Sequence, residues 1–400
     1  MANEFVAEPD LRFAKDLIDA GGGDLKKCYQ CATCSVACRI APDNNPYPRK
    51  EMIWAQWGMK DRLLNDPDVW LCHQCNDCST QCPRGAYPAD VMKAVRKMLI
   101  QQYSWPSFLG KLVGTPALMI VAVAIPIIIV LALVYLNNGF SFPKPIHYGH
   151  FIDYVYIQVV FTLALIFAVI SLVLSLRKYW ERLQSSSVIE VKTSRKPFIP
   201  SLIEGLSEIL PHTTFKECEA NNIRYASHLL VFWGMIGLFV TTAIVAFNID
   251  ILHIDPPSRG GPGTLPIKVL GNVSAVAFVL GLAIMLVRRL TAPDQAGTSS
   301  YFDWFFLFTI FGTGATGLLT ELARWSGSIG GTYNLYTIHL MFVLTLLLYL
   351  PFSKFAHLGY RTIAITWAKS AGRNLKYPVQ PNYIPAPVAT EESASGEAKA

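Results

Sequence analysis

Eight of the nine cysteines in this 400-residue chain fall into two groups that share one spacing. Each group reads Cys-x2-Cys-x2-Cys-x3-Cys, and the members are Cys28, Cys31, Cys34 and Cys38 in the first and Cys72, Cys75, Cys78 and Cys82 in the second. Thiolates at this spacing hold [4Fe-4S] cubanes, and in domains with two clusters the fourth cysteine of a run ligates the other cluster. The chemistry predicted for this segment is therefore one-electron transfer.

The spacing also predicts how the sulfurs divide between the clusters. One cluster takes Cys28, Cys31, Cys34 and Cys82, and the other takes Cys72, Cys75, Cys78 and Cys38. Structural zinc is the alternative, but zinc sites use four ligands in two pairs, which disfavours it here. Pro83 follows the second run as expected, whereas Arg39 follows the first, and the ninth cysteine, Cys218, is interpreted as a bystander.

Histidines in apolar segments are the second set of candidate ligands. His228, His339 and His357 lie in or beside such segments, where a polar side chain is costly and usually functional. His339 and His357 are 18 residues apart, or about 27 Å along a continuous helix, which would place both rings on one face. This predicts haem b ligation, with His228 and His357 paired at one depth.

The partner of His339 is open. His150, at the start of a predicted span, is the best-placed candidate for an outer haem, with His147 and His253 less suited, and the alternative for His150 is a histidine in the headgroup layer. His73 and His212 are predicted to be solvated. Haem b is therefore expected once or twice per chain.

The elements that must position these ligands are membrane helices. The chain is 52% hydrophobic and 16% charged, against about 25% charged in soluble domains, which excludes a disordered chain or an ordinary soluble enzyme. Six apolar stretches are long enough to cross about 30 Å of hydrocarbon: 112–136, 151–176, 225–247, 269–287, 301–320 and 334–351. The net charge of +6 comes from the membrane half. No stripe of Lys and Arg with stacking aromatic residues accompanies it, so nucleic-acid binding is not expected.

Loop charges predict the orientation. The connection 177–224 is rich in Lys and Arg, whereas the opposite loops offer only Lys144, Arg259, Lys268 and Arg324, so both termini and the iron–sulfur domain are expected in the cytoplasm. The first ten residues have no signal-peptide pattern, which fits reduced cysteines. The expected fold is an all-α membrane protein, with an iron–sulfur domain over 1–108, a six-span haem b bundle over 109–360 and a cytoplasmic tail over 361–400 that ends in disorder.

Two further segments are candidates for surface or substrate binding. Residues 198–211 place Leu202, Ile203, Leu206, Ile209 and Leu210 on one helical face, which fits a helix in the membrane interface or a partner- or quinone-binding surface. For quinone itself, the candidates are Glu321 with Arg324 and Trp325, or His147 with Lys144, and an interface belt is the alternative for both groups.

At these residues the chain resembles known families. WLCHQCNDCSTQCPRGAYPADVMKAVRK (70–97) and KCYQCATCSVACR (27–39) resemble the ferredoxin-like C subunits of heterodisulfide reductases. The membrane half is similar to their cytochrome b subunit and to the gamma subunit of respiratory nitrate reductases, in which one span carries haem ligands ten residues apart and a later span carries two 18 apart. His339 and His357 match the later pair and His228 the first of the earlier pair, but Leu238 stands at the remaining position.

The fusion of both modules resembles the C subunits of the quinone-interacting (quinone-modifying) membrane-bound oxidoreductases of sulfate-reducing prokaryotes. That resemblance implies a protein that oxidises menaquinol and passes electrons through haem b and two [4Fe-4S] clusters to flavin- and iron–sulfur-containing A and B subunits, with adenylylsulfate reductase as acceptor. No nucleotide-binding glycine pattern is present, so the chain is expected to be one part of an oxidoreductase and not a whole enzyme. The alternatives are a membrane electron-transfer protein of a heterodisulfide or sulfite pathway and a haem-free membrane anchor.

Overall fold

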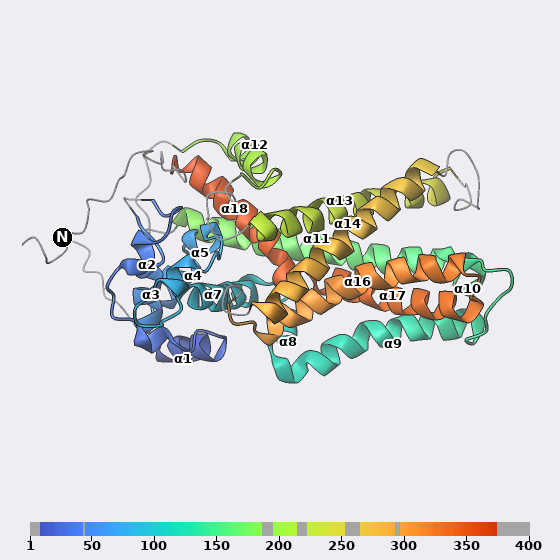
Figure 1. Cartoon of the computed structure of the whole chain (residues 1–400), viewed down its shortest axis with the longest axis horizontal. Helices are drawn as coiled ribbons and strands as arrows, with labels where there is room; N and C mark the ends of the chain where they lie inside the picture. The colour runs from blue at the N-terminus through green and yellow to red at the C-terminus, as the bar shows by residue number, and fades with distance from the viewer. Residues whose placement is uncertain are drawn as a thin grey trace, which may run out of the picture.

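The computed structural model describes residues 9–42, 45–185, 195–213, 222–252, 265–292 and 297–373. Within these ranges the regular elements are all helices, as the sequence predicts. The N-terminal part holds α1 (Leu11–Asp19), α2 (Thr33–Val36), α3 (Arg49–Gln56), α4 (Lys60–Leu64), α5 (Asp68–Leu71), α6 (Asp77–Thr80) and α7 (Pro88–Tyr103). Figure 1 shows this part at one end of a long helical bundle.

The N-terminal part has its own apolar core. Leu17 of α1, Met52 of α3, Leu63 of α4 and Leu99 of α7 have no exposed surface. Asp10 caps α1, because its carboxylate accepts hydrogen bonds from the backbone N–H groups of Arg12 and Phe13 at 3.0 Å. A packed core around the two cysteine loops fixes the backbone that must present the sulfurs.

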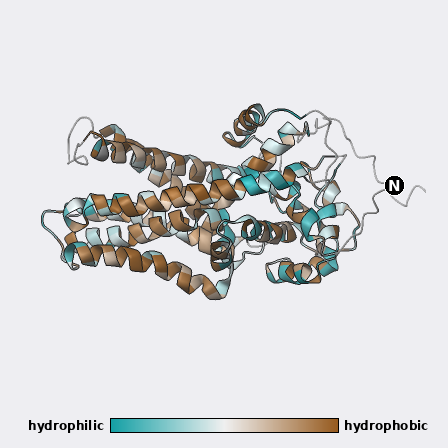
Figure 2. Ribbon diagram, turned by 180° about the vertical axis from the view of Figure 1, so that it is seen from behind, coloured by the Kyte–Doolittle hydropathy of each residue, from teal (hydrophilic) through white to brown (hydrophobic). Residues whose placement is uncertain are grey.

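Six helices of the described chain are long and apolar enough to cross a membrane, which agrees with the number predicted. They are α9 (Met119–Asn138), α11 (Tyr154–Ser185), α13 (Asn222–Asp250), α14 (Leu265–Thr291), α16 (Tyr301–Trp325) and α17 (Ile329–Tyr349). Figure 2 shows that the residues of these helices are predominantly hydrophobic, and large apolar side chains such as Ile128, Leu163 and Val273 are exposed on them. Hydrophobic side chains turned outward are what a helix needs when lipid replaces water around it.

Shorter helices precede, connect and follow the spans. These are α8 (Ser107–Gly114), in which the predicted boundary at residue 108 falls, and α10 (Tyr148–Phe151), α12 (Phe198–Ile209) and α18 (His357–Ser370). Figure 1 shows α10 at the end of the bundle away from the N-terminal part, and α12 and α18 beside that part.

Small residues bring α13 and α14 close together. A Cβ at Gly234 would lie 2.8 Å from the backbone nitrogen of Phe278, and one at Gly281 would lie 2.7 Å from the carbonyl of Ser227. Close backbone approach at glycine is the usual way in which membrane helices associate. The pair positions the N-terminal turns of α13, which carry Arg224 and His228.

The structure corrects one expectation about the last span. α17 ends at Tyr349, a short 3-10 turn runs through Pro351, and His357 is the first residue of the separate helix α18. The expectation that His339 and His357 share one continuous helix is therefore wrong. Proline cannot donate the next helical hydrogen bond, and Ser353 caps a new turn by accepting from the backbone N–H of Phe355.

The helix α18 includes residues 361–370, which the sequence places in the cytoplasmic tail. It packs against α12, α11 and α5. The predicted disorder after Tyr377 lies outside the described residues. Because α5 belongs to the N-terminal part and α11 to the bundle, α18 joins the two halves.

The amphipathic helix α12 turns its small residues, and not its apolar stripe, toward α18. Ser201 is fully buried, and a Cβ at Gly205 would lie 3.2 Å from Cγ2 of Ile365. The outward stripe is Ile199, Ile203, Leu206 and Leu210, with exposed fractions of 67%, 63%, 37% and 40%. This stripe shares Ile203, Leu206 and Leu210 with the face that the sequence assigns to the membrane interface or to a partner, whereas Leu202 and Ile209 of that face are half-buried.

Stacked aromatic rings fill the junction between the two halves. Trp70 of α5 stacks on Tyr360 of α18 with ring centres 5.2 Å apart, and Tyr103 of α7 meets Tyr179 of α11 at 5.4 Å. All four side chains are buried. Aromatic contacts of this kind add to the apolar burial and hold a defined geometry, so the cysteine loops keep a fixed position above the bundle.

Candidate redox site

The two cysteine loops have the same backbone conformation. The second residue after the first cysteine has positive φ in both loops (Gln30 at 62° and Gln74 at 53°), and so does the fourth (Ala32 at 68° and Asn76 at 76°). The third cysteine of each loop then lies in a one-turn helix, α2 or α6, and these helices pack on each other. The repeated spacing in the sequence is thus a structural repeat with two equivalent thiol cradles.

Cysteines of the two loops lie close to one another. Burial raises the pKa of the Cys34 thiol to about 12, and the neighbouring charges that add to the rise are those of Cys28, Cys31 and Cys82. Burial likewise raises the pKa of Cys38 to about 12, and its cysteine neighbours are Cys72 and Cys75. This proximity supports the predicted division, in which each cluster takes its fourth cysteine from the other loop. Binding of iron would supply the charge that stabilises these thiolates.

The two cradles differ in exposure. Cys31 is exposed, as are Tyr29 (70%) and Val36 (86%) beside it, whereas its counterpart Cys75 in the second loop is half-buried. The third cysteines of the two loops, Cys34 and Cys78, are both buried. The backbone N–H of Gln74 donates to Cys72 Sγ at 3.3 Å, and that of Ala86 donates to Cys82 Sγ at 3.4 Å. Exposure and hydrogen bonds to sulfur are among the factors that set the potential of a cluster.

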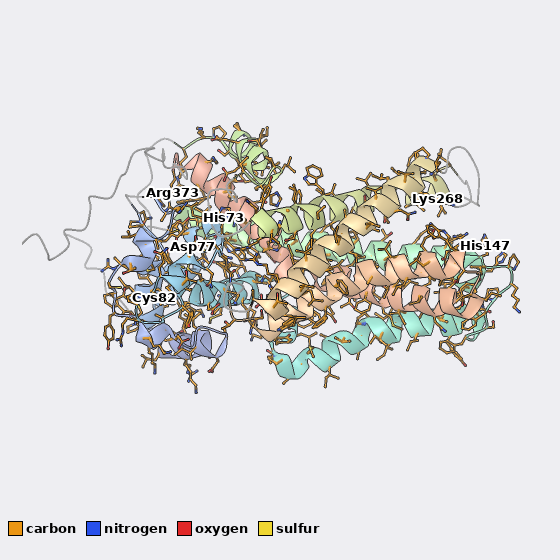
Figure 3. All side chains as sticks on the ribbon, viewed as in Figure 1. His73, Asp77, Cys82, His147, Lys268 and Arg373 are labelled. Carbon is orange, nitrogen blue, oxygen red and sulfur yellow. The ribbon has the colours of Figure 1, made fainter. Side chains whose placement is uncertain are left out.

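The second loop lies against the membrane half. His73 is buried, and its ring lies 2.7 Å from a guanidinium nitrogen of Arg361 in α18. Figure 3 shows His73 beside α18, with Cys82 farther from the bundle. The solvated position predicted for His73 is therefore wrong. The cradle of Cys72, Cys75, Cys78 and Cys38 is the one nearer the bundle, and we call its loop and its predicted cluster the inner loop and the inner cluster.

Beneath this loop the predicted pair of histidines comes together. The rings of His228 and His357 have centres 6.5 Å apart and planes at 79°. A metal–imidazole bond is about 2 Å long, so one metal ion can lie between the two rings. Both side chains line a cavity of about 580 Å³, within the usual range for a cofactor pocket.

The hydrogen bond of His357 Nδ1 leaves Nε2 as the ring nitrogen that could bind a metal. Its Nδ1 lies 2.6 Å from the carbonyl oxygen of Lys354, and since a carbonyl only accepts, the proton is on Nδ1. Nε2 therefore keeps its lone pair. A backbone carbonyl that orients the ring in this way is typical of metal-binding histidines. Burial lowers the pKa of His357 to about 4, so the ring is neutral at pH 7.

A third histidine, His212, supports the pair and is missed by the sequence reading, which places it in solvent. It is 7% exposed, and its Nε2 lies 2.9 Å from Nδ1 of His228. Its position after a proline in a loop gave no signal of burial. Three histidines therefore lie side by side at the end of the bundle next to the cysteine loops, with His228 between His212 and His357.

The other predicted haem ligands are not brought together. His339 lies halfway along α17, and its Nδ1 donates to the carbonyl of Thr313 in α16 at 3.0 Å. His150 is exposed in α10, with its ring 4.3 Å from that of His147. No contact joins His150 to His339 in the part of the chain that the structure describes. His253 and Cys218 lie outside that part.

The predicted quinone residues of the outer end lie apart from the cavity. The guanidinium of Arg324 covers the ring of Tyr148 at 5.2 Å, and Trp325 is 58% exposed. His147 packs on His150. These contacts resemble the interface belt that is the alternative interpretation of these residues.

The cavity at the end of the bundle next to the cysteine loops has a composition that suits a haem. Its lining is mostly apolar and includes Phe232, Phe278 and Leu307, together with the cations Lys97 and Arg288. A porphyrin is a flat apolar ring with two carboxylates, and an apolar cavity that also contains cations complements it. The residues present therefore fit the group, which the two imidazoles would hold.

Comparison with known proteins agrees with the two-part organisation. Residues 24–86 match the 4Fe-4S dicluster domain, and residues 112–376 match the family described as citrate utilization protein B. The chain is 33% identical over 105 residues to a protein of Archaeoglobus profundus that is similar to the C subunit of heterodisulfide reductase, which covers 26% of this chain and 56% of that protein. It is 36% identical over 88 residues to the C subunit of the H(2):CoB-CoM heterodisulfide,ferredoxin reductase of Methanothermobacter marburgensis, covering 22% and 47%.

The chain thus spans about half the length of the curated relatives that it matches. No solved structure gives a significant match. Fold and site together define a helical membrane protein with an N-terminal 4Fe-4S dicluster domain of the heterodisulfide reductase C type. Because the match over 112–376 takes up more than half of the chain, the protein belongs to the citrate utilization protein B family.

Proposed function

We propose that this chain is the membrane subunit of a quinone-linked oxidoreductase complex, with haem b held by His228 and His357 and two [4Fe-4S] clusters held by the eight cysteines. The observation that carries the proposal is the pair of imidazoles with ring centres 6.5 Å apart, in a large cavity beneath the inner cysteine loop. When bound, haem and clusters take up and release one electron at a time.

The position of the cavity also suits a lipid-soluble substrate. Its wall includes Leu165, Val169 and Phe239, whose exposed fractions of 42%, 51% and 43% place them on the lipid-facing surface as well. A quinol dissolved in the bilayer can therefore approach the histidines from the side. We take menaquinol as the substrate that the resemblance implies.

The exposed cradle supports a soluble partner at the other end. Cys31 is exposed and is flanked by the exposed side chains Tyr29 and Val36. The relatives are named after the C subunits of complexes, which implies companion subunits. We propose flavin- and iron–sulfur-containing A and B subunits as the partners and adenylylsulfate reductase as the acceptor. A heterodisulfide acceptor is the second candidate, because the relatives carry that name.

The test is haem b per purified chain, measured as the pyridine haemochrome, with a quinol-reduced difference spectrum. We expect at least one haem that quinol reduces, and its loss in His228→Ala and His357→Ala with the iron content unchanged. His150→Ala is the matched control, because His150 is exposed at the far end of the bundle. A wild-type chain without haem would contradict the proposal and leave a bare anchor. Loss in His150→Ala alone would contradict the pairing.

A further inference from the structure

Two helices approach the inner cysteine loop, and both carry the same pair of residues. In α13, Arg224 precedes His228 by four residues, and in α18, Arg361 follows His357 by four. Residues four apart share one face of a helix, one turn from each other. Each imidazole of the pair therefore has an arginine of its own helix beside it.

Both arginines bind the loop that starts at Cys72. Arg224 donates to the carbonyl oxygens of His73 at 2.8 Å and Gln74 at 2.5 Å. Arg361 donates to the carbonyl oxygen of Cys72 at 3.2 Å and lies 2.7 Å from Nε2 of His73. The fork of a guanidinium suits it to such double contacts, which fix direction as well as distance.

The loop depends on outside partners for its shape. Gln74 and Asn76 are non-glycine residues with φ of 53° and 76°, a conformation that costs energy unless its surroundings hold it. A third arginine, Arg96 of α7, donates to the carbonyl of Cys72 at 2.6 Å and to the side chain of Gln74 at 3.0 Å. Arg96 lies in α7 of the N-terminal part, so it shapes the loop without linking it to α13 or α18.

We propose that Arg224 and Arg361 are positioning residues that lock the inner cluster to the histidine pair, so that each axial-ligand helix also fixes one side of the Cys72–Gln74 loop. This inference rests on the proposed function. It assigns the arginines a role that Arg96 does not share, because only the first two connect the loop to α13 and α18.

We expect the loss of these arginines to change the distance between the inner cluster and the histidine pair, and not only the charge near the cluster. In the full chain we would compare Arg224→Gln, Arg361→Gln and the double variant with Arg96→Gln. Each removes one cation near the cluster, so each should lower its potential in a redox titration followed by electron paramagnetic resonance. Only the α13 and α18 variants should also lose the enhancement of cluster spin relaxation that a nearby oxidised haem produces, and the double variant should lose most.

Haem and iron content are measured in every variant and should match the wild type. Arg361→Lys separates charge from geometry, since lysine keeps the charge but lacks the fork, so it should restore the potential and not the relaxation enhancement. If the α13 and α18 variants lose their haem, the lysine variant decides the question by the same signal. Unchanged enhancement in the double variant, or an equal loss in Arg96→Gln, would overturn the inference. Absence of haem from the wild type would instead refute the proposed function.

Discussion

His212 and His228 are joined by a hydrogen bond of 2.9 Å whose direction the surroundings determine. Nδ1 of His212 lies 3.3 Å from the carbonyl oxygen of Leu210, which can only accept, so the proton of the neutral ring is on Nδ1 and Nε2 is the acceptor. Burial lowers the pKa of His212, which keeps the ring neutral at pH 7. His228 therefore donates from Nδ1, and its Nε2 holds the lone pair.

Replacing His212 should weaken haem binding without removing a ligand. His212→Ala takes away the acceptor that fixes the tautomer of His228, and loss of such a partner typically costs about 10- to 100-fold in metal affinity. His212→Gln offers a carbonyl oxygen instead and should retain most of the haem. The measurement is haem retained during dilution in detergent, and equal retention in wild type and His212→Ala would contradict the assignment.

Serine variants of the two fourth cysteines should damage opposite clusters. Cys82→Ser should remove the signal of the cluster held by Cys28, Cys31 and Cys34, and Cys38→Ser should remove that of the inner cluster. The reason is the proposed pairing, in which each cluster takes its fourth cysteine from the other loop. Electron paramagnetic resonance of the reduced proteins distinguishes them, since only the inner cluster lies near the histidines. The opposite assignment would show that each loop keeps its own fourth ligand.

The buried acids of the dicluster domain should respond oppositely to neutralisation. Lys50 Nζ lies 2.6 Å from Asp66 and from Asp68, and 2.9 Å from Glu51, while Arg373 of the C-terminal segment pairs with Asp68. Asp68→Asn leaves both cations short of a partner, and breaking a buried pair costs about 3–5 kcal/mol. Thermal unfolding in detergent should show a lower midpoint for this variant.

Glu51→Gln should instead stabilise the protein at neutral pH. Burial raises the pKa of Glu51 well above its usual 4.5, so the native state must hold a proton that the unfolded chain releases. The stability from this proton is complete below about pH 4.5 and is lost as the pH rises through the native pKa. The gain of Glu51→Gln should therefore grow from acid to neutral pH. A constant difference across that range would contradict the assignment.

The proposed orientation can be tested at the two ends of the bundle. Figure 3 shows Lys268 at the end far from Cys82, so a cysteine there should be reached from outside the cell. Arg182 lies on α11 near Tyr103 of the dicluster domain and serves as the control position. In intact cells, an impermeant maleimide should label Lys268→Cys and spare Arg182→Cys. The reverse pattern would invert the topology.

Hydropathy was enough to predict the six spans, because segment length and charge distribution determine them. The depth of the histidines in those spans was enough to predict that the rings of His228 and His357 lie near each other. Spacing was not enough to place His357, since counting turns assumes an unbroken helix and Pro351 ends this one. The same assumption led to the prediction that His339 and His357 lie on one face of a single helix.

Other features were invisible because they depend on packing between distant segments. Nothing near His212 or His73 indicates burial, and each becomes buried only when α12, α13 and α18 assemble around it. The four-residue spacing of arginine and histidine in α13 and in α18 was present in the sequence, and only the fold shows that both pairs meet one loop.

The contacts of α18 constrain how the protein is made. The ribosome synthesises the cysteine loops first, yet the arginines that bind the second loop and Asp68 come later in the chain. Arg224 lies at the start of the third span, and Arg361 and Arg373 follow the last span. The N-terminal domain therefore emerges without its final supports and completes its structure only once the last helix has been inserted and has folded back. Maturation of the inner cluster is expected to follow membrane insertion, and a truncated chain that ends before α18 should accumulate with that cluster incomplete.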